Sequence, residues 1–158
     1  MSQKYVIAHF FEPQPEGYNF ASAAWPPHVT ILSNFATDWQ VEKIIRTIET
    51  LAKQTAPFEI QTAGEAWFGP KQNVHVRLVE PSEPIIALHL QLLAIAEDNS
   101  FRLDAPHYLG EGYRPHISLH GTTNFPAGWR HHVANLTLVD MFPKGDISRR
   151  EIIKSFSF

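Results

Sequence analysis

A five-residue pattern occurs twice in this chain, at residues 27–31 (PHVTI) and at residues 115–119 (PHISL). Each copy places a histidine two positions before a hydroxyl, among β-branched or aliphatic residues that favour extended strands. Side chains two positions apart in a strand point to the same face, at a rise of about 3.3 Å per residue. Each copy therefore predicts a strand with an imidazole and a hydroxyl side by side. If the two strands are neighbours, both pairs converge on one cleft.

The composition is typical of a single globular domain over residues 1–158. Of the 158 residues, 44% are hydrophobic and 18% are charged, as in ordinary folded domains. The chain has no cysteine, which excludes disulfides, thiolate catalysis and cysteine–zinc sites. No apolar run approaches the roughly 20 residues that span a bilayer, and residues 1–5 carry no signal-peptide segment. We therefore expect a cytoplasmic protein with no membrane partner.

Charge limits the partners of this chain. A net charge of −3 argues against binding of long nucleic acid, which needs a dense basic face. A small or terminal substrate is expected instead. The sequence assigns no oligomeric state.

The histidines outside the repeated pattern are predicted to be structural or exposed. On a strand, His116 and His120 would lie about 13 Å apart, too far for two ligands at about 2.0–2.1 Å from one zinc ion. The adjacent His131 and His132 would face opposite sides of a strand, at surface positions. We predict neither a metal site nor a cofactor. Structural roles are expected for His9, His75, His89 and His107.

The remaining patterns predict an α+β fold. Apolar spacing indicates helices over 41–52, after a capping-box pattern at 37–40, and over 82–98, where Ser82 is the expected cap. A turn at 69–72 joins two of the strands as an antiparallel hairpin. The predicted strands lie at 4–11, 58–68 and 73–79, and near 114–120, 131–141 and 151–158. Because regular βαβ alternation is absent, helices are expected on the outer faces of antiparallel sheets.

Two histidines suit acid–base chemistry on a phosphodiester. The unperturbed pKa of histidine, about 6.5, makes both protonation states available near neutrality. Hydrolysis of a cyclic phosphate needs one group to take a proton from water and another to give a proton to the departing ribose oxygen. Hydroxyls at Thr30 and Ser118 can stabilise charge on the phosphate oxygens. The sequence therefore predicts an enzyme that needs no metal.

The pair His28-Val29-Thr30 and His116-Ile117-Ser118 resembles the signature of the two-histidine phosphoesterase superfamily, which includes 2′-5′ RNA ligase-like proteins and cyclic nucleotide phosphodiesterases. The resemblance covers nearly the whole chain. It implies a bilobal fold of two antiparallel sheets with pseudo-two-fold symmetry and an active cleft between the lobes. It also implies metal-independent hydrolysis of a 2′,3′-cyclic phosphate on a nucleotide or RNA end, with His28 and His116 as the catalytic pair.

The chain departs from the family pattern near both motifs. An aromatic residue often follows the first motif, whereas residues 32–34 (LSN) separate that motif from Phe35 here. An arginine often follows the second motif, whereas Leu119 is followed here by histidine and glycine. Arg77, on a predicted strand face with Asn73 and His75, is the candidate replacement for that cation. Three aromatic residues are candidates for stacking a base, as aromatic side chains do with unpaired nucleotides: Phe35, Trp67 and Tyr113.

Several alternatives are compatible with the same residues. Within enzymes, these are 2′-5′ phosphodiester cleavage or ligation and opening of an ADP-ribose cyclic phosphate. In a different class, a nucleotide- or RNA-end-binding module keeps the cleft and lacks catalysis. For Thr30 and Ser118, the structural alternative is a cross-strand hydrogen bond. One His-x-Thr tripeptide occurs readily by chance, so the functional prediction depends on the pair.

Overall fold

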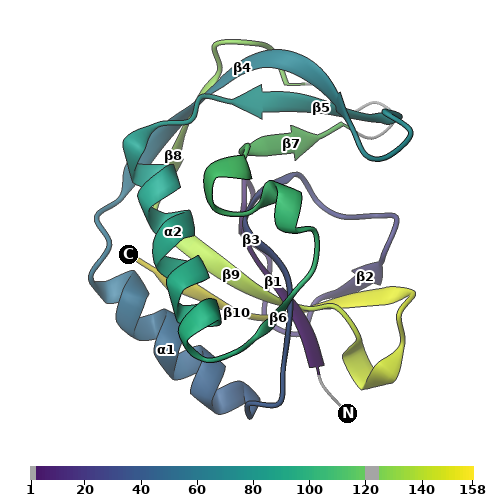
Figure 1. The fold of residues 1–158 in the computed structure, drawn as a ribbon, viewed down its shortest axis with the longest axis vertical. Coiled ribbons are helices and arrows are strands. Elements are labelled where there is room, and N and C mark those ends of the chain that lie inside the picture. Colours follow the sequence, from purple (N-terminus) through teal and green to yellow (C-terminus); the bar gives the residue numbers. More distant parts are fainter. Residues whose placement is uncertain (1–2, 120–124) are drawn as a thin grey trace.

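The computed structural model describes residues 3–119 and 125–158, and its strands form two antiparallel sheets (Figure 1). The six-stranded sheet has the order β2 (Asn19–Ala21), β10 (Arg149–Ser157), β9 (Asn135–Asp140), β1 (Gln3–Phe10), β3 (His28–Thr37) and β6 (Arg102–Leu103). The four-stranded sheet has the order β7 (His116–Ser118), β5 (Val74–Val79), β4 (Phe58–Phe68) and β8 (Arg130–Val133). The predicted α+β class with two antiparallel sheets is confirmed.

Two helices lie along one side of these sheets, α1 (Val41–Lys53) and α2 (Glu83–Asp98) (Figure 1). The described residues also form three short 3-10 helices, η1 (Pro106–Tyr108), η2 (Gly110–Gly112) and η3 (Pro143–Gly145). The predicted apolar stripe of α2 is buried, from Ile85 to Ala96. In the described ranges, no helix is long and apolar enough to cross a membrane.

The predicted cap of α1 is wrong, and the predicted cap of α2 is correct in position only. The N-cap of α1 is Gln40, whose side chain makes no capping hydrogen bond. The Thr37 hydroxyl instead accepts a hydrogen bond from the backbone N–H of Trp39 at 3.1 Å, so it closes a local turn. Ser82 does occupy the N-cap of α2, yet its side chain makes no capping bond either. Burial of the apolar faces therefore holds these helices, as it does most helices in proteins.

The single strand predicted near residues 131–141 is two separate strands in the structure. The segment 131–141 contains β8 in the small sheet and β9 in the large sheet, with Ala134 between them. At this corner the carbonyl of Ala134 accepts a hydrogen bond from the backbone N–H of Phe158 at 2.9 Å. The chain thus passes from one sheet to the other without a helix, and a hydrophobic pattern alone does not reveal the change of sheet.

A pair of histidines bridges the two sheets, which corrects the surface position predicted for His131. Nε2 of His131, on β8, lies 2.8 Å from Nε2 of His9, on β1. Nδ1 of His9 donates to the carbonyl of Asn135 at 3.0 Å. Because that bond fixes the proton on Nδ1, Nε2 of His9 accepts the hydrogen bond from His131. The sequence also predicted that His116 and His120 do not share a zinc ion, and His120 lies outside the described residues.

Alternating burial along β3 and β7 orients the two motifs. Val29, Ile31 and Ile117 are completely buried in the main core. The intervening residues of each motif are half-buried and point to the other face of their strand. The predicted same-face pairing of histidine and hydroxyl is therefore confirmed within each motif.

Candidate active site

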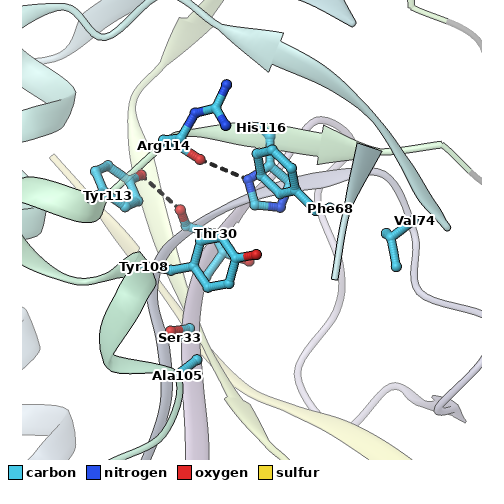
Figure 2. Close-up of a pocket in the computed structure, with 9 residues that line it drawn as sticks. All are labelled: Thr30, Ser33, Phe68, Val74, Ala105, Tyr108, Tyr113, Arg114 and His116. Carbon is cyan, nitrogen blue, oxygen red and sulfur yellow. Dashed lines mark hydrogen bonds between the residues drawn. The ribbon is translucent and has the colours of Figure 1, made fainter. Parts of the chain in front are cut away.

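A cavity of about 230 Å³ lies where β3 of the large sheet contacts β7 of the small sheet (Figure 2). Its lining residues are Thr30, Ser33, Phe68, Val74, Ala105, Tyr108, Tyr113, Arg114 and His116. Thr30 belongs to the first repeated motif and His116 to the second. The fold thus brings one residue of each motif to the same cavity, and His28 precedes Thr30 by two positions on the same strand face.

The two motif histidines are held by the same kind of hydrogen bond. Nδ1 of His28 donates to the carbonyl of Pro26 at 2.8 Å. Nδ1 of His116 donates to the carbonyl of Arg114 at 2.7 Å, the bond drawn in Figure 2. A carbonyl only accepts, so Nδ1 carries the proton in both rings. In the neutral form the lone pair of each ring is therefore on Nε2. Nε2 is the atom through which each imidazole can take or give a proton.

Aromatic rings flank each of these imidazoles. The ring of Phe68 meets that of His116 edge to face, with centroids 4.6 Å apart. On the other strand, His28 contacts Trp25, with centroids 4.6 Å apart, and Phe10 at 5.4 Å. Burial lowers the pKa of His116, and the positive charge of Arg114 lowers this pKa further. His116 is therefore neutral at neutral pH.

Hydrogen bonds behind the cavity fix the strand that carries Thr30. The hydroxyl of Tyr113 donates to the carbonyl of Thr30 at 2.8 Å. The ring of Tyr113 stacks on His89 at 3.9 Å. Nδ1 of His89 donates to the carbonyl of Ile31 at 2.7 Å, and its Nε2 accepts from the backbone N–H of Gly110 at 3.0 Å. This arrangement gives His89 its expected structural role. Burial also raises the pKa of Tyr113, which keeps its hydroxyl a neutral donor.

The structure places Arg77 on the opposite face of the small sheet. Leu78 lies directly opposite His116 between β5 and β7, whereas Arg77 lies opposite the buried Ile117. The Arg77 guanidinium donates to two backbone carbonyls at 2.6 and 3.1 Å and pairs with Glu65 at 3.1 Å. Its donors therefore tie β5 to β4 and to the segment before β8, and this side chain is not among the residues that line the cavity.

The three aromatic candidates have different positions. Tyr113 lines the cavity. Phe35 is 1% exposed and stacks on Phe101 with centroids 5.4 Å apart, inside the core. Trp67 is 56% exposed and stacks on His75 at 4.4 Å, away from the lining residues. Ser118 is half-buried on the same face of β7 as His116, two positions further along.

Six lining residues were not among the predicted site residues, and three of these six carry polar groups: Ser33, Tyr108 and Arg114. For Arg114 a signal existed, because it stands two positions before His116, the spacing that also pairs His116 with Ser118. The hydroxyl of Ser33 is buried and has no hydrogen-bond partner within the described structure. Tyr108 stacks on Phe68 with centroids 5.6 Å apart. It lies in the η1 segment, where no periodic pattern marks a position.

Two antiparallel sheets, with a His-x-Thr strand and a His-x-Ser strand meeting at one cavity, define a protein of the two-histidine phosphoesterase class. The chain belongs to the 2′-5′ RNA ligase superfamily, whose family model matches residues 7–140. That match contains both motifs.

Bacterial relatives are similar over part of this chain. A Bacillus pumilus (strain SAFR-032) protein with the name "Putative phosphoesterase" is 34% identical over 70 residues, which are 44% of this chain and 41% of that protein. A protein from a Geobacillus species (strain WCH70) with the same kind of name is 29% identical over 103 residues, which are 64% of this chain and 60% of that protein. The chain thus spans about half the length of the curated relatives that it matches.

Solved structures with low sequence identity share the whole fold. TT0787 of Thermus thermophilus has a TM-score of 0.62 and 20% identity, with 98% of this chain and 97% of that chain covered. E. coli LigT complexed with 3′-AMP has a TM-score of 0.59 and 18% identity, with 100% and 99% covered. A further LigT structure holds NADP+. The likeness supports the two-sheet architecture described above.

Proposed function

We propose that this protein is a phosphoesterase that hydrolyses a 2′,3′-cyclic phosphate on a nucleotide or RNA end, with His28 and His116 as its acid–base pair. The observation that carries the proposal is the matched hydrogen bonding of the two imidazoles. Each has Nδ1 bound to the carbonyl two residues earlier. Two rings fixed in the same tautomer on equivalent strands are suited to complementary proton transfers through Nε2.

In the proposed reaction, neutral His116 is the base. Its Nε2 takes a proton from water, and the resulting hydroxide forms a bond to phosphorus. The bond between phosphorus and O3′ breaks, and protonated His28 gives its proton to that oxygen. The products are a 2′-phosphate and a 3′-hydroxyl. Thr30 and Ser118 donate hydrogen bonds to the non-bridging oxygens, where negative charge increases in the transition state.

The choice of substrate is supported by the superfamily and by the size of the cavity. A cavity of about 230 Å³ accommodates a small or terminal group, in keeping with the net charge of −3, which disfavours long nucleic acid. LigT, which shares the fold, is known in complexes with 3′-AMP and with NADP+. We therefore expect the cavity of this chain to bind the phosphate group of a nucleotide.

The proposal is tested with 2′,3′-cyclic AMP and the variants His28→Ala and His116→Ala. Each variant is expected to lose about two to four orders of magnitude in kcat, the usual contribution of one proton-transfer group. The pH–rate profile of the unaltered protein should be bell-shaped. Its acidic limb should lie below the usual histidine value of about 6.5, because the pKa of His116 is lowered by burial. Rates measured by product chromatography should be unchanged by a chelator.

The exposed His132 on β8 supplies the matched control. His132→Ala should keep the full rate. Rates near those of the unaltered protein in both motif variants would contradict the assigned pair. Tight nucleotide binding without turnover of any cyclic phosphate would instead favour the non-catalytic binding module.

A further inference from the structure

Among the described residues that line the cavity, Arg114 is the one with a permanently charged side chain. An anionic phosphate entering this space leaves water and needs a compensating cation, because an unpaired charge is costly away from solvent. His116 cannot supply that charge while it is neutral. The position of Arg114 therefore bears directly on how a phosphate would bind.

The guanidinium of Arg114 is held by a contact that leaves its hydrogen-bond donors available. Its Cζ lies 4.9 Å from the centre of the Phe68 ring, within the range of a cation–π interaction. Within the described residues, no hydrogen bond or ion pair to this guanidinium is present. Arginine offers five N–H donors in a planar fork that matches the oxygens of a phosphate. Arg77 contrasts with it, because its donors are engaged by carbonyls and by Glu65.

Arg114 and His116 form one unit with Phe68. The backbone carbonyl of Arg114 orients His116 through Nδ1 at 2.7 Å. Phe68 contacts His116 edge to face at 4.6 Å and also receives the guanidinium on its ring. A phosphate bound by the guanidinium would therefore lie beside the imidazole whose orientation Arg114 also fixes.

We propose that Arg114 binds the phosphoryl oxygens of the substrate in this cavity and is the principal cation of the site. This inference deepens the proposed function, on which it rests for the identity of the substrate. Side chain and backbone of the same residue then have complementary roles, since one binds the phosphate and the other orients the base.

The experiment measures binding of two probes that do not react, inorganic phosphate and 3′-AMP, by calorimetry on the full chain. Arg114→Met keeps a long side chain on Phe68 and removes the charge. We expect about 10- to 100-fold weaker binding of both probes, the usual effect of losing hydrogen bonds to a charged group. Arg114→Lys should recover part of the loss, because lysine restores the charge without the planar fork. Arg46→Met, on an exposed position of α1, is the matched control and should bind as the unaltered protein does.

A second readout separates charge from structure. Removing the cation removes one of the causes that lower the pKa of His116. In Arg114→Met, the acidic limb of the pH–rate profile should therefore move to higher pH, whereas Arg114→Lys should keep it near its original position. KM should rise more than kcat falls.

The outcomes distinguish this inference from the proposed function. Unchanged binding of phosphate and 3′-AMP by folded Arg114→Met would overturn the role of Arg114, and so would failure of the unaltered protein to bind either probe. If Arg114→Met does not fold, the uncharged variant Arg114→Gln decides, because an unchanged affinity in that variant would equally overturn the role of Arg114. Arg114-dependent binding without turnover would keep the inference and contradict only the hydrolytic proposal.

Discussion

At the scale of single residues, the backbone before each motif histidine decides which ring nitrogen is available for chemistry. The carbonyls of Pro26 and Arg114 accept from Nδ1 of His28 and His116. A proline follows each of these two carbonyl-bearing residues in the chain and favours extended backbone at the residue before it. The Pro-His step is thus part of the site, because it places an accepting carbonyl two residues before the ring.

Ser33 provides a test at the same scale. A buried hydroxyl without a partner costs free energy, and such a group at a cavity points to a ligand contact. Ser33→Ala should leave the free energy of unfolding unchanged or raise it by about 1 kcal/mol or less. It should raise KM for a 2′,3′-cyclic nucleotide about 2- to 10-fold, the effect of one neutral hydrogen bond. Chemical denaturation and steady-state kinetics measure the two effects.

Ser82 is the control for that substitution. Its hydroxyl is also buried and without a partner in the described structure, but it lies at the start of α2. Ser82→Ala should leave KM unchanged. An unaltered KM in Ser33→Ala would show that the substrate does not use this hydroxyl.

Because residues two positions apart in a strand share a face, the sequence predicted that histidine and hydroxyl lie side by side in each motif. It did not predict which face of β5 points to the cavity. Arg77 and His75 were placed correctly on one strand face. The pairing of Arg77 with Ile117 turns that face away from His116. Register between strands distant in sequence sets this choice, and local periodicity carries no information about it.

At the scale of secondary-structure elements, an irregular strand pairing and short turns contribute to the cavity beside the regular strands. The pairing of β1 with β3 shifts between Tyr5 and Ile7 and again between Ile7 and Ala8. Such irregularities break strict alternation, so Leu32 is buried beside Ile31 and Ser33 reaches the cavity. The helices and the hairpin were predictable from sequence because apolar periodicity defines them. The bulges were not, since each depends on the partner strand.

The η1–η2 segment, residues 106–112, gives an element-scale prediction. A Cβ added at Gly112 would lie 2.0 Å from the carbonyl oxygen of His107, so the backbone must move. This segment carries Tyr108 and leads directly into Tyr113, which both line the cavity. Gly112→Ala should cost about 1 to 3 kcal/mol of stability, as overpacking does, and should lower kcat/KM.

Gly64→Ala is the matched substitution, because a Cβ at Gly64 meets nothing within 4 Å. It should leave both the midpoint of thermal unfolding and kcat/KM close to their original values. Equal behaviour of the two variants in calorimetry and kinetics would mean that the η1–η2 segment adapts without cost.

At the scale of the whole molecule, the site depends on two sheets keeping a fixed relation to each other. Beside the cavity, Tyr113 links the segment before β7 to β3, and His89 links helix α2 to β3. Elsewhere, the hydrogen bond between His9 and His131 links β1 of the large sheet to β8 of the small one. Both links use buried imidazoles that are neutral, because burial lowers the pKa of His9 and of His89.

The link through His9 makes stability depend on pH. Burial lowers the pKa of His9 from 6.5 to about 4, and the charge of His131 adds to the shift. Between these two values the unfolded chain binds a proton that the folded chain does not, so the free energy of unfolding falls as pH decreases. From pH 7 to pH 4.5 the loss should reach about 2 to 3 kcal/mol, at 1.36 kcal/mol per pKa unit. The pKa values of His89, His116 and His131 are lowered as well, so His9→Gln should remove the largest single part of the dependence in urea unfolding, whereas the exposed substitution His107→Gln should keep it. The same slope in His9→Gln and in the unaltered protein would refute this account, because the pH dependence would then arise from groups other than His9.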